Sequence, residues 1–405
     1  MAQSISQEAI GATGLPGATA ASRHAGATVS GAPTTGTFAV GDFIVDQSGA
    51  MYVCTVAGTP GTWQLSGVSV NENIAGKNFV INGGFDIWQR GTSFSSTTSV
   101  TYTADRWGYS TAVTAGTYTI SQIASGLTGF KYANRVQRTS GSTQTGSFYF
   151  GNSIETLNSL PMAGQTVTLS FWARAGANYS PTSSYLTPNV YSGTGTDLNI
   201  LNGSFTGLAS VASQLCVLTT SWQKFTLTGT VGSTATQLAL QFVETPTGTA
   251  GANDYFDITG VQLEIAPQAT PFSRAGGSIG GELALCYRYY YRTTAYNQTT
   301  GSTYVYSQLS TANVASSAGQ IYLQPMVPVA MRTNPTALDY NLSNIGAFAG
   351  GVSRIAITSI SIASGSQFFP GVVLNSSTNS FTQGQTYVLQ DQGSGNGYLG
   401  ISAEL

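Results

Sequence analysis

The chain has 405 residues and only 30 charged side chains, 14 Lys plus Arg and 16 Asp plus Glu, or 7% where an average soluble protein has roughly 25%. A net charge of −2 without clustered Lys and Arg excludes nucleic acid as a partner and excludes a polybasic membrane anchor. No apolar run approaches the ~20 residues of a spanning helix, and no signal-peptide core follows Met1, so membrane insertion is not expected.

The cysteine and histidine content limits the chemistry that the chain can perform. Cys54, Cys216 and Cys286 are far apart and have no metal-ligand spacing, which predicts buried thiols in a protein made in a reducing cytosol. The single histidine, His24, is too few for a histidine metal cluster or a Ser/His/Asp triad.

The N-terminal part divides into three predicted segments. Residues 1–21 form an attachment segment, in which residues 11–19 place Gly at every third position. This is collagen geometry and would imply a parallel trimer, although a flexible Gly/Ala/Pro linker fits equally well. Residues 22–66 predict a small β module, with strands at 37–46 and 50–56 around a hairpin turn, which is too small to bury much core without a partner chain. Residues 67–77 predict a polar linker.

The rest of the chain predicts two β domains joined by a hinge and one helix. Apolar and polar residues alternate at 167–174, 222–228 and 238–244, which indicates half-buried antiparallel strands within a domain at 78–272. Residues 273–292 predict a hinge and a helix that runs from Glu282 to Arg292, because this stretch lacks Gly and Pro and its end charges suit the helix dipole. Residues 293–405 predict a second β domain, so the fold class is all-β.

A tyrosine cluster near the helix has two interpretations. Tyr287, Tyr289, Tyr290 and Tyr291 follow one another closely. They can form core and trimer contacts, or they can form an aromatic surface for sugars, since tyrosine gives a large contact area at low entropy cost.

Three motifs resemble bacteriophage tail fibres and other virion appendages that carry a carbohydrate-binding-module-like jelly-roll domain. Residues 78–107 read NFVINGGFDIWQRGTSFSSTTSVTYTADRW and resemble the opening of such a domain; residues 255–264, YFDITGVQLE, resemble its closing strand. The segment ELALCYRYY at 282–290 resembles the helix that follows the jelly roll in such proteins. The β module at 22–66 is similar to a module that follows collagen-like stretches in phage fibres.

This resemblance implies a structural and adhesive virion protein on the exterior of a phage particle, assembled in the cytoplasm of the host bacterium. It implies a homotrimeric tail fibre with a β-jelly-roll sandwich and a C-terminal β-sandwich. Other virion proteins would hold its N-terminus, and host cell-surface polysaccharide would be bound by multivalent, non-catalytic contacts. The alternative is a capsid-decorating head fibre or a tail-assembly protein without receptor binding.

The opening motif supplies the candidate site residues. Aromatic faces stack on sugar rings while acids and guanidinium groups bond their hydroxyls, which suggests a platform of Trp88, Trp107, Asp86, Arg90, Asp105 and Arg106. The competing interpretation places both tryptophans in the core, with paired Asp and Arg side chains fastening the first strand to the last.

Calcium is the one metal that the resemblance suggests, because similar jelly rolls often hold a structural calcium ion near their first and last strands. Asp86, Asp257 and Asn82 would supply the hard oxygen ligands here. No cofactor is required for the implied function.

An enzyme is not expected. Glycoside hydrolysis needs two carboxylates across a cleft, and no spacing in the sequence pairs any two of Glu155, Glu244, Asp254 and Glu264.

Overall fold

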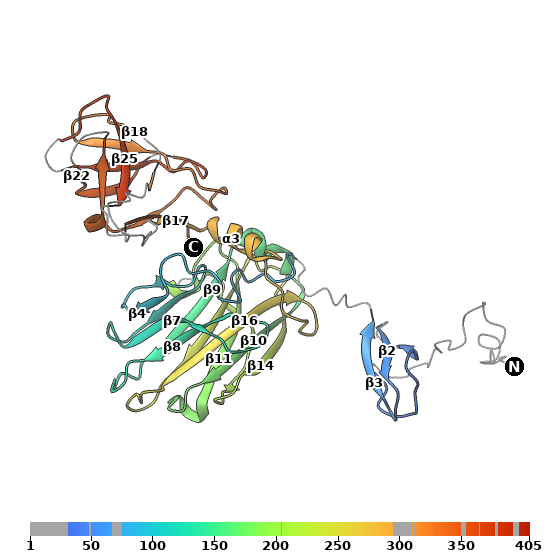
Figure 1. Ribbon diagram of the computed structural model, residues 1–405. Helices are drawn as coiled ribbons and strands as arrows, with labels where there is room; N and C mark the ends of the chain where they lie inside the picture. Colours follow the sequence, from blue (N-terminus) through green and yellow to red (C-terminus); the bar gives the residue numbers. More distant parts are fainter. Residues whose placement is uncertain are drawn as a thin grey trace, which may run out of the picture. The chain divides into compact units, whose positions relative to one another are not determined.

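The computed structural model describes residues 31–47, 50–66, 75–203, 205–294, 309–310, 313–349, 354–363, 365–376, 380–391 and 397–405. These residues confirm the predicted all-β fold, and the chain divides into two compact units, Met1–Glu72 and Asn73–Leu405 (Figure 1). The predicted collagen-like stretch at 11–19 lies outside the described residues.

The first unit contains a three-stranded antiparallel sheet in the order β1-β2-β3, formed by β1 (Phe43–Val45), β2 (Met51–Val56) and β3 (Thr62–Ser66). Ile44 and Cys54 are the buried hydrophobic side chains among its described residues, and the ring of Phe38 packs edge-on against Trp63 with centroids 4.8 Å apart. The first strand is shorter than predicted because the carboxylate of Asp42 accepts the backbone N–H of Ala39 at 2.9 Å and holds a turn before β1.

The second unit begins with a jelly-roll sandwich of two antiparallel sheets. One has the order β14-β10-β16-β8-β7-β4, and the other has the order β12-β11-β15-β9-β6-β5, with β13 paired to β11. The strands are β4 (Ser93–Ser95), β5 (Thr101–Tyr102), β6 (Gly108–Thr111), β7 (Tyr118–Ala124), β8 (Tyr132–Arg138), β9 (Phe148–Ile154), β10 (Thr166–Ala175), β11 (Tyr185–Gly193), β12 (Ala209–Ser213), β13 (Cys216–Val217), β14 (Gln223–Thr230), β15 (Gln237–Glu244) and β16 (Tyr255–Ile265).

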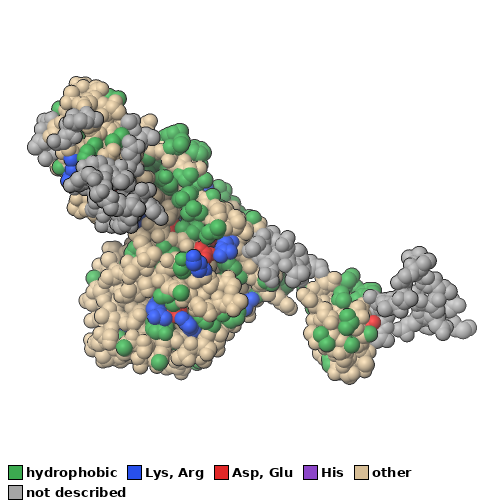
Figure 2. Space-filling model, viewed as in Figure 1, with side chains coloured by type: hydrophobic (Ala, Val, Ile, Leu, Met, Phe, Trp, Pro, Cys, Tyr) green, Lys and Arg blue, Asp and Glu red, His purple; other side chains and the backbone are tan. Residues whose placement is uncertain are grey.

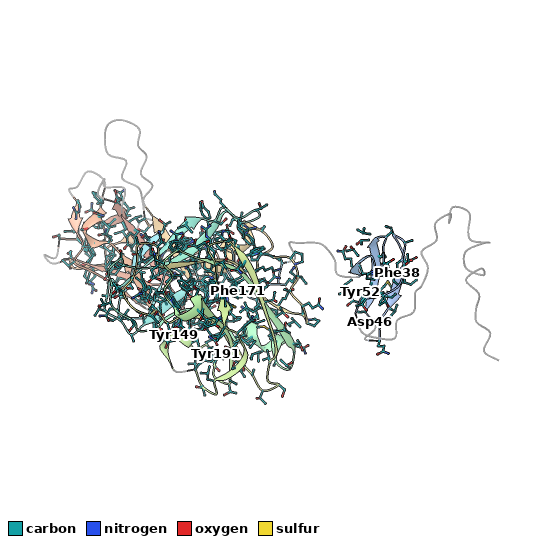
Figure 3. The ribbon with its side chains drawn as sticks, turned by 90° about the horizontal axis from the view of Figure 1, so that it is seen from below. Phe38, Asp46, Tyr52, Tyr149, Phe171 and Tyr191 are labelled. Atoms are coloured by element: carbon teal, nitrogen blue, oxygen red, sulfur yellow. The ribbon has the colours of Figure 1, made fainter. Side chains whose placement is uncertain are left out.

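The core of the sandwich follows from the alternation in these strands. Val167, Leu169 and Phe171 of β10 point inward and are fully or almost fully buried, as are Leu238 and Leu240 of β15. Phe171 therefore lies among the interior side chains (Figure 3). The polar residues of β10 alternate with them on the opposite face of the sheet, where Thr168 and Ser170 are also buried.

A short helix, α3 (Ile279–Tyr287), connects the two β domains of this unit. The Ser278 side chain caps it by accepting the N–H of Gly281, so the helix begins before Glu282. It also ends earlier than predicted, because Tyr290–Thr294 forms strand β17 and pairs with β26 (Tyr398–Ser402). No helix among the described residues is long and apolar enough to cross a membrane. The other helical segments are α2 (Thr156–Ser159) and 3-10 turns at Leu160–Met162, Thr182–Ser184, Ile200–Asn202 and Leu342–Asn344.

The second β domain consists of three small antiparallel sheets in the orders β17-β26-β20, β18-β25-β21-β22 and β19-β24-β23. Ile321, Leu374 and Leu389 are among the fully buried residues of its core. The remaining strands are β18 (Asn313–Val314), β19 (Gln320–Leu323), β20 (Ala337–Tyr340), β21 (Ile345–Phe348), β22 (Ile355–Ala356), β23 (Ser359–Ile362), β24 (Val372–Asn375) and β25 (Thr386–Asp391). Tyr289 and Tyr290 are buried within this same chain, so these two tyrosines are core residues.

A group of charged side chains is buried inside the jelly roll. Arg138 and Asp254 are both fully buried and form an ion pair with N–O distance 2.7 Å. Glu244 is fully buried as well, and neither of its carboxylate oxygens has a hydrogen-bond partner among the described residues. Burial, followed by the negative charge of Asp254, raises the pKa of Glu244 well above its ordinary value, against the opposing effect of Arg138. Tyr118 and Tyr179 are further titratable groups close enough to Glu244 to feel its charge.

Replacing Glu244 with glutamine is expected to make the stability of the protein less dependent on pH. A carboxyl group whose pKa is higher in the folded than in the unfolded state stabilises the fold at low pH, and that stability is lost as pH rises toward the folded pKa. The free energy of unfolding of the wild type should therefore fall as pH rises above about 4.5, and Glu244→Gln should reduce this fall. Denaturation of both proteins between pH 6 and 8 measures this fall. Equal slopes of the free energy of unfolding against pH in the wild type and in Glu244→Gln would contradict the raised pKa of Glu244.

Candidate functional site

The structure places half of the predicted sugar platform in the interior. Trp107 is fully buried, its ring lies against Phe150 with centroids 5.0 Å apart, and its Nε1 donates to the carbonyl of Asn82 at 3.1 Å. Asp105 and Arg106 are 1% and 2% exposed. The predicted sugar contacts of these three residues are therefore wrong, because no face of them is open to a ligand; the core interpretation describes them.

Asp105 and Arg106 instead hold the interior of the unit together. Asp105 accepts the backbone N–H of Gln89 at 2.8 Å, and burial raises the pKa of its carboxyl group to about 6. The Arg106 guanidinium forms an ion pair with Glu404 and lies 3.7 Å over the ring of Tyr289. The pair with Glu404 joins the opening motif to the end of the sequence, and the contact with Tyr289 joins it to the segment that follows α3.

Trp88 and Asp86 do not face a common ligand position either. The ring of Trp88 is half-buried and packs on the core, and its Nε1 donates to the carbonyl of Phe85 at 2.9 Å. Asp86 forms an ion pair with Arg274 at 2.8 Å. The Asp86–Arg274 pair fastens the opening segment to the hinge that follows the closing strand.

The residues predicted to hold calcium do not fit that ion. Asp257 is fully buried and both of its oxygens accept from arginines, Arg135 at 2.7 and 3.0 Å and Arg174 at 2.8 Å. The Asn82 side-chain oxygen accepts the backbone N–H of Ile87, and Asp86 is paired with its own arginine. The three side chains have different partners, so a calcium ion here would have to displace guanidinium groups. No cluster of three or more His, Cys, Asp or Glu residues suited to a metal occurs in the described part of the chain.

Of the predicted site residues, Arg90 lines a cavity formed by described residues. Inside the Asn73–Leu405 unit, a cavity of about 530 Å³ lies where β5 of the jelly roll meets β17, β20 and β26 of the second β domain. We call it the junction crevice, and the residues that define it are Arg90, Phe94, Tyr102, Tyr290, Asp339 and Tyr398.

One donor atom of Arg90 has no protein partner in the part of the chain that the structure describes. Its guanidinium carbon lies 3.6 Å over the ring of Tyr290 and 5.4 Å from the ring centroid of Tyr102, and its Nη2 pairs with Glu404 at 3.3 Å. The Nη1 atom is buried and has no acceptor among the described residues. A buried donor of this kind is costly unless a ligand or water accepts from it.

Asp339 supplies the carboxylate of the crevice. It accepts the hydroxyl hydrogen of Tyr290 at 2.8 Å and also lies close to Tyr398. Burial is the main cause of the raised pKa values of both tyrosines, and the negative charge of Asp339 adds to it. Both hydroxyl groups therefore stay protonated at neutral pH and can act as donors.

The walls of the crevice are fixed by contacts between the two β domains. The Tyr102 hydroxyl donates to the Leu405 carbonyl at 3.0 Å, and Arg332 pairs with Asp197 at 2.8 Å. Aromatic walls with one guanidinium and one carboxylate can stack on an apolar ring face while bonding neighbouring hydroxyls. The sequence motif contained Arg90 and Tyr102, but nothing in the sequence linked them to Asp339 and Tyr398, which come from strands far along the chain.

A second aromatic group serves packing. Tyr149 and Tyr191 lie near one another on the outer face of the sheet that contains β15 (Figure 3), where they pack against a buried cluster that includes Ile200 and Phe205. Burial, followed by the proximity of Tyr149, raises the pKa of Tyr191. This cluster covers part of that sheet face, so the junction crevice remains the better candidate site.

No protein-family model and no curated protein sequence matches the chain. Solved structures similar to it include a CBM4 protein, with 19% identity over 47% of this chain and 100% of the other, at a TM-score of 0.29. The CBM22-1 xylan-binding domain of Paenibacillus barcinonensis Xyn10C has 14% identity over 48% of this chain and 98% of its own length, at a TM-score of 0.28. The enzymatically active domain of bacteriophage CBA120 tailspike protein 4 has 14% identity over 47% of this chain and 22% of its own, at a TM-score of 0.27.

Proposed function

We propose that this protein binds glycans without modifying them, and that the junction crevice holds a neutral saccharide residue. The observation that carries this proposal is the buried Nη1 donor of Arg90 beside a cavity of about 530 Å³. Ligand pockets typically enclose roughly 300–1,000 Å³ and combine aromatic walls with a few placed polar groups.

The charges around the crevice favour a neutral ligand. Arg90 is already paired with Glu404, and Asp339 contributes a negative charge to the same cavity. A sugar hydroxyl can accept from Arg90 while donating to Asp339, and a tyrosine ring can cover the apolar face of the sugar. A strongly anionic ligand would have to approach the Asp339 carboxylate, which is unfavourable.

The biological setting that we propose is the exterior of a phage particle. The motifs at 78–107, 255–264 and 282–290 support this through their resemblance to tail fibres. Weak single-site binding would be converted to avidity by a homotrimer whose N-terminal segment is held by other virion proteins, and the ligand would be host cell-surface polysaccharide. The low charge of the chain suits this role, because contacts to hydroxyl groups depend little on ionic strength.

Filling the crevice is expected to abolish glycan binding. Ala337 is exposed and lines the crevice, so Ala337→Trp occupies the cavity without removing a contact; Ala356, an exposed alanine of β22, provides the matched control Ala356→Trp. Asp339→Asn should weaken binding about tenfold or more, because a hydrogen bond to a charged group contributes roughly 1.5–3 kcal/mol. Calorimetric titration with neutral trisaccharides of glucose, galactose and xylose measures these affinities.

The outcomes separate the candidate functions. Saturable binding that Ala337→Trp removes and Ala356→Trp preserves supports the crevice. Binding that both variants retain places the sugar site elsewhere. Failure of the purified protein to bind host cells in a sugar-competed manner would favour a capsid-decorating or tail-assembly protein instead. Release of reducing sugar from host polysaccharide would contradict a non-catalytic role.

A further inference from the structure

The outer face of the sheet that contains β10 and β16 carries a second group of aromatic and charged side chains. Register pairs Arg174 of β10 with Asp257 of β16, and Asp257 with Arg135 of β8, so the three side chains form a row across this face. Trp172 lies two residues from Arg174 on the same face and is paired with Lys224 of β14. We call this the arginine row.

Aromatic rings support both arginines. The guanidinium carbon of Arg135 lies 3.6 Å over the ring of Tyr255, and that of Arg174 lies 4.7 Å from the ring of Trp222. The two arginine side chains are 23% and 26% exposed, while Asp257 beneath them is fully buried. The guanidinium planes are thus held in place by their rings and by Asp257 while one side of each faces outward.

Donor atoms of the row remain available. Arg174 uses only its Nε to contact Asp257, and Arg135 uses Nε and Nη2. Among the described residues no acceptor contacts either Nη atom of Arg174, so its two Nη groups form an unused fork. A planar carboxylate accepts from such a fork through two parallel hydrogen bonds.

The charge of this face is positive. Arg135, Arg174 and exposed Lys224 face one carboxylate, that of Asp257. The other carboxylate on these strands, Glu264, pairs in register with Thr168, six residues from Arg174 along β10 and therefore about 20 Å away. Glu264 is buried and accepts from Gln262 and Thr270, so it adds little negative charge at the row. In Figure 2 most of the jelly-roll surface is tan, and its few blue and red side chains lie in small groups.

We propose that the arginine row is a second saccharide site, distinct from the junction crevice, and that it binds a sugar residue bearing a carboxylate. The carboxylate accepts from the Nη fork of Arg174, and the positive charges of Arg135 and Lys224 add long-range attraction. The half-buried ring of Trp172 offers an apolar surface for the sugar ring beside this carboxylate. The two sites together would allow the protein to bind a polysaccharide that contains both neutral and acidic residues.

The test compares trigalacturonic acid with its fully methyl-esterified form, which has the same rings and no charge. Wild-type protein should bind the acid and should bind it less tightly as salt is raised, whereas the ester should bind at least tenfold more weakly. Arg174→Gln should weaken binding of the acid at least tenfold, and Arg174→Lys, which keeps the charge but loses the fork, should also weaken it.

Arg274→Gln is the matched control, because Arg274 is 27% exposed and paired with an aspartate but lies outside the row. It should leave the affinity for trigalacturonic acid unchanged, and Ala337→Trp in the junction crevice should leave it unchanged as well. Circular dichroism melts of each variant check that it is folded, and Arg135→Gln provides a second variant should Arg174→Gln unfold. The proposal would be overturned if the ester bound as tightly as trigalacturonic acid. It would also be overturned if Arg274→Gln lost as much affinity for the acid as Arg174→Gln. A change of oligomeric state in the row variants with unchanged sugar binding would also overturn it, by identifying the row as an interface between copies.

Discussion

Replacing Glu404 with alanine is expected to lower the free energy of unfolding by about 3–5 kcal/mol, the usual effect of removing one partner from a buried ion pair. Glu404 is 6% exposed and pairs with both Arg106 and Arg90, which belong to the opening motif of the jelly roll. Without Glu404, the almost fully buried Arg106 loses its carboxylate partner. The positive charge would then be buried without compensation, and the contact between the two β domains would weaken.

Chemical denaturation followed by tryptophan fluorescence measures this loss. Asp86→Ala is the matched control, because the Asp86–Arg274 pair is more exposed, and its removal should cost less than the removal of Glu404. Glu404→Ala should also weaken neutral sugar binding, since Arg90, which lines the junction crevice, loses the carboxylate that holds its guanidinium in place. Wild-type stability in Glu404→Ala would show that this ion pair does not join the domains.

Replacing Arg138 with methionine is expected to destabilise the jelly roll by a similar amount, about 3–5 kcal/mol, for a different reason. Arg138 is fully buried, pairs with Asp254 and donates to the carbonyls of Ser142 and Gln144, which lie in a loop. Methionine fills much of the same volume as arginine. The loss in the free energy of unfolding therefore measures the contribution of the Arg138 charge and of its hydrogen bonds. Both Asp254 and Glu244 would then lack a cation.

A second variant distinguishes charge from packing. Adding Asp254→Asn and Glu244→Gln to Arg138→Met removes the two uncompensated carboxylates, and it should recover part of the lost stability. Denaturation at pH 7 compares the proteins. Absence of any recovery would mean that the hydrogen bonds of Arg138, and not its charge, account for the loss.

The strands of the jelly roll were predictable because one face of each is buried. The alternation at 238–244 places Leu238, Leu240 and Phe242 on one face, and all three are fully buried in β15. A two-residue period of this kind is imposed locally by the pleat of a strand. The pairing order of the strands was not predictable, since it depends on contacts between segments far apart in the sequence.

The helix boundary was predicted wrongly for the same reason. Nothing between Glu282 and Arg292 breaks a helix, yet the chain leaves the helix after Tyr287 and enters β17. The backbone of Tyr290–Thr294 is paired with β26, more than 100 residues later, and aromatic and β-branched residues suit a strand. Local propensity could not reveal this partner.

The candidate site was only partly predictable. The motif identified Arg90, which lines the junction crevice, and wrongly included Trp107, which is core. A large apolar ring flanked by Asp and Arg fits a sugar platform and a fastened core equally well, and only its burial distinguishes them. Asp339 and Tyr398 were missed because tertiary pairing alone brings β20 and β26 to the opening motif.

Diffraction from crystals soaked with the tightest-binding neutral trisaccharide would show whether the junction crevice holds sugar. We expect a sugar ring in the junction crevice, with one hydroxyl within hydrogen-bond distance of Nη1 of Arg90 and another near Asp339. A ring bound at another position at saturating sugar, with the crevice containing only water, would contradict this expectation.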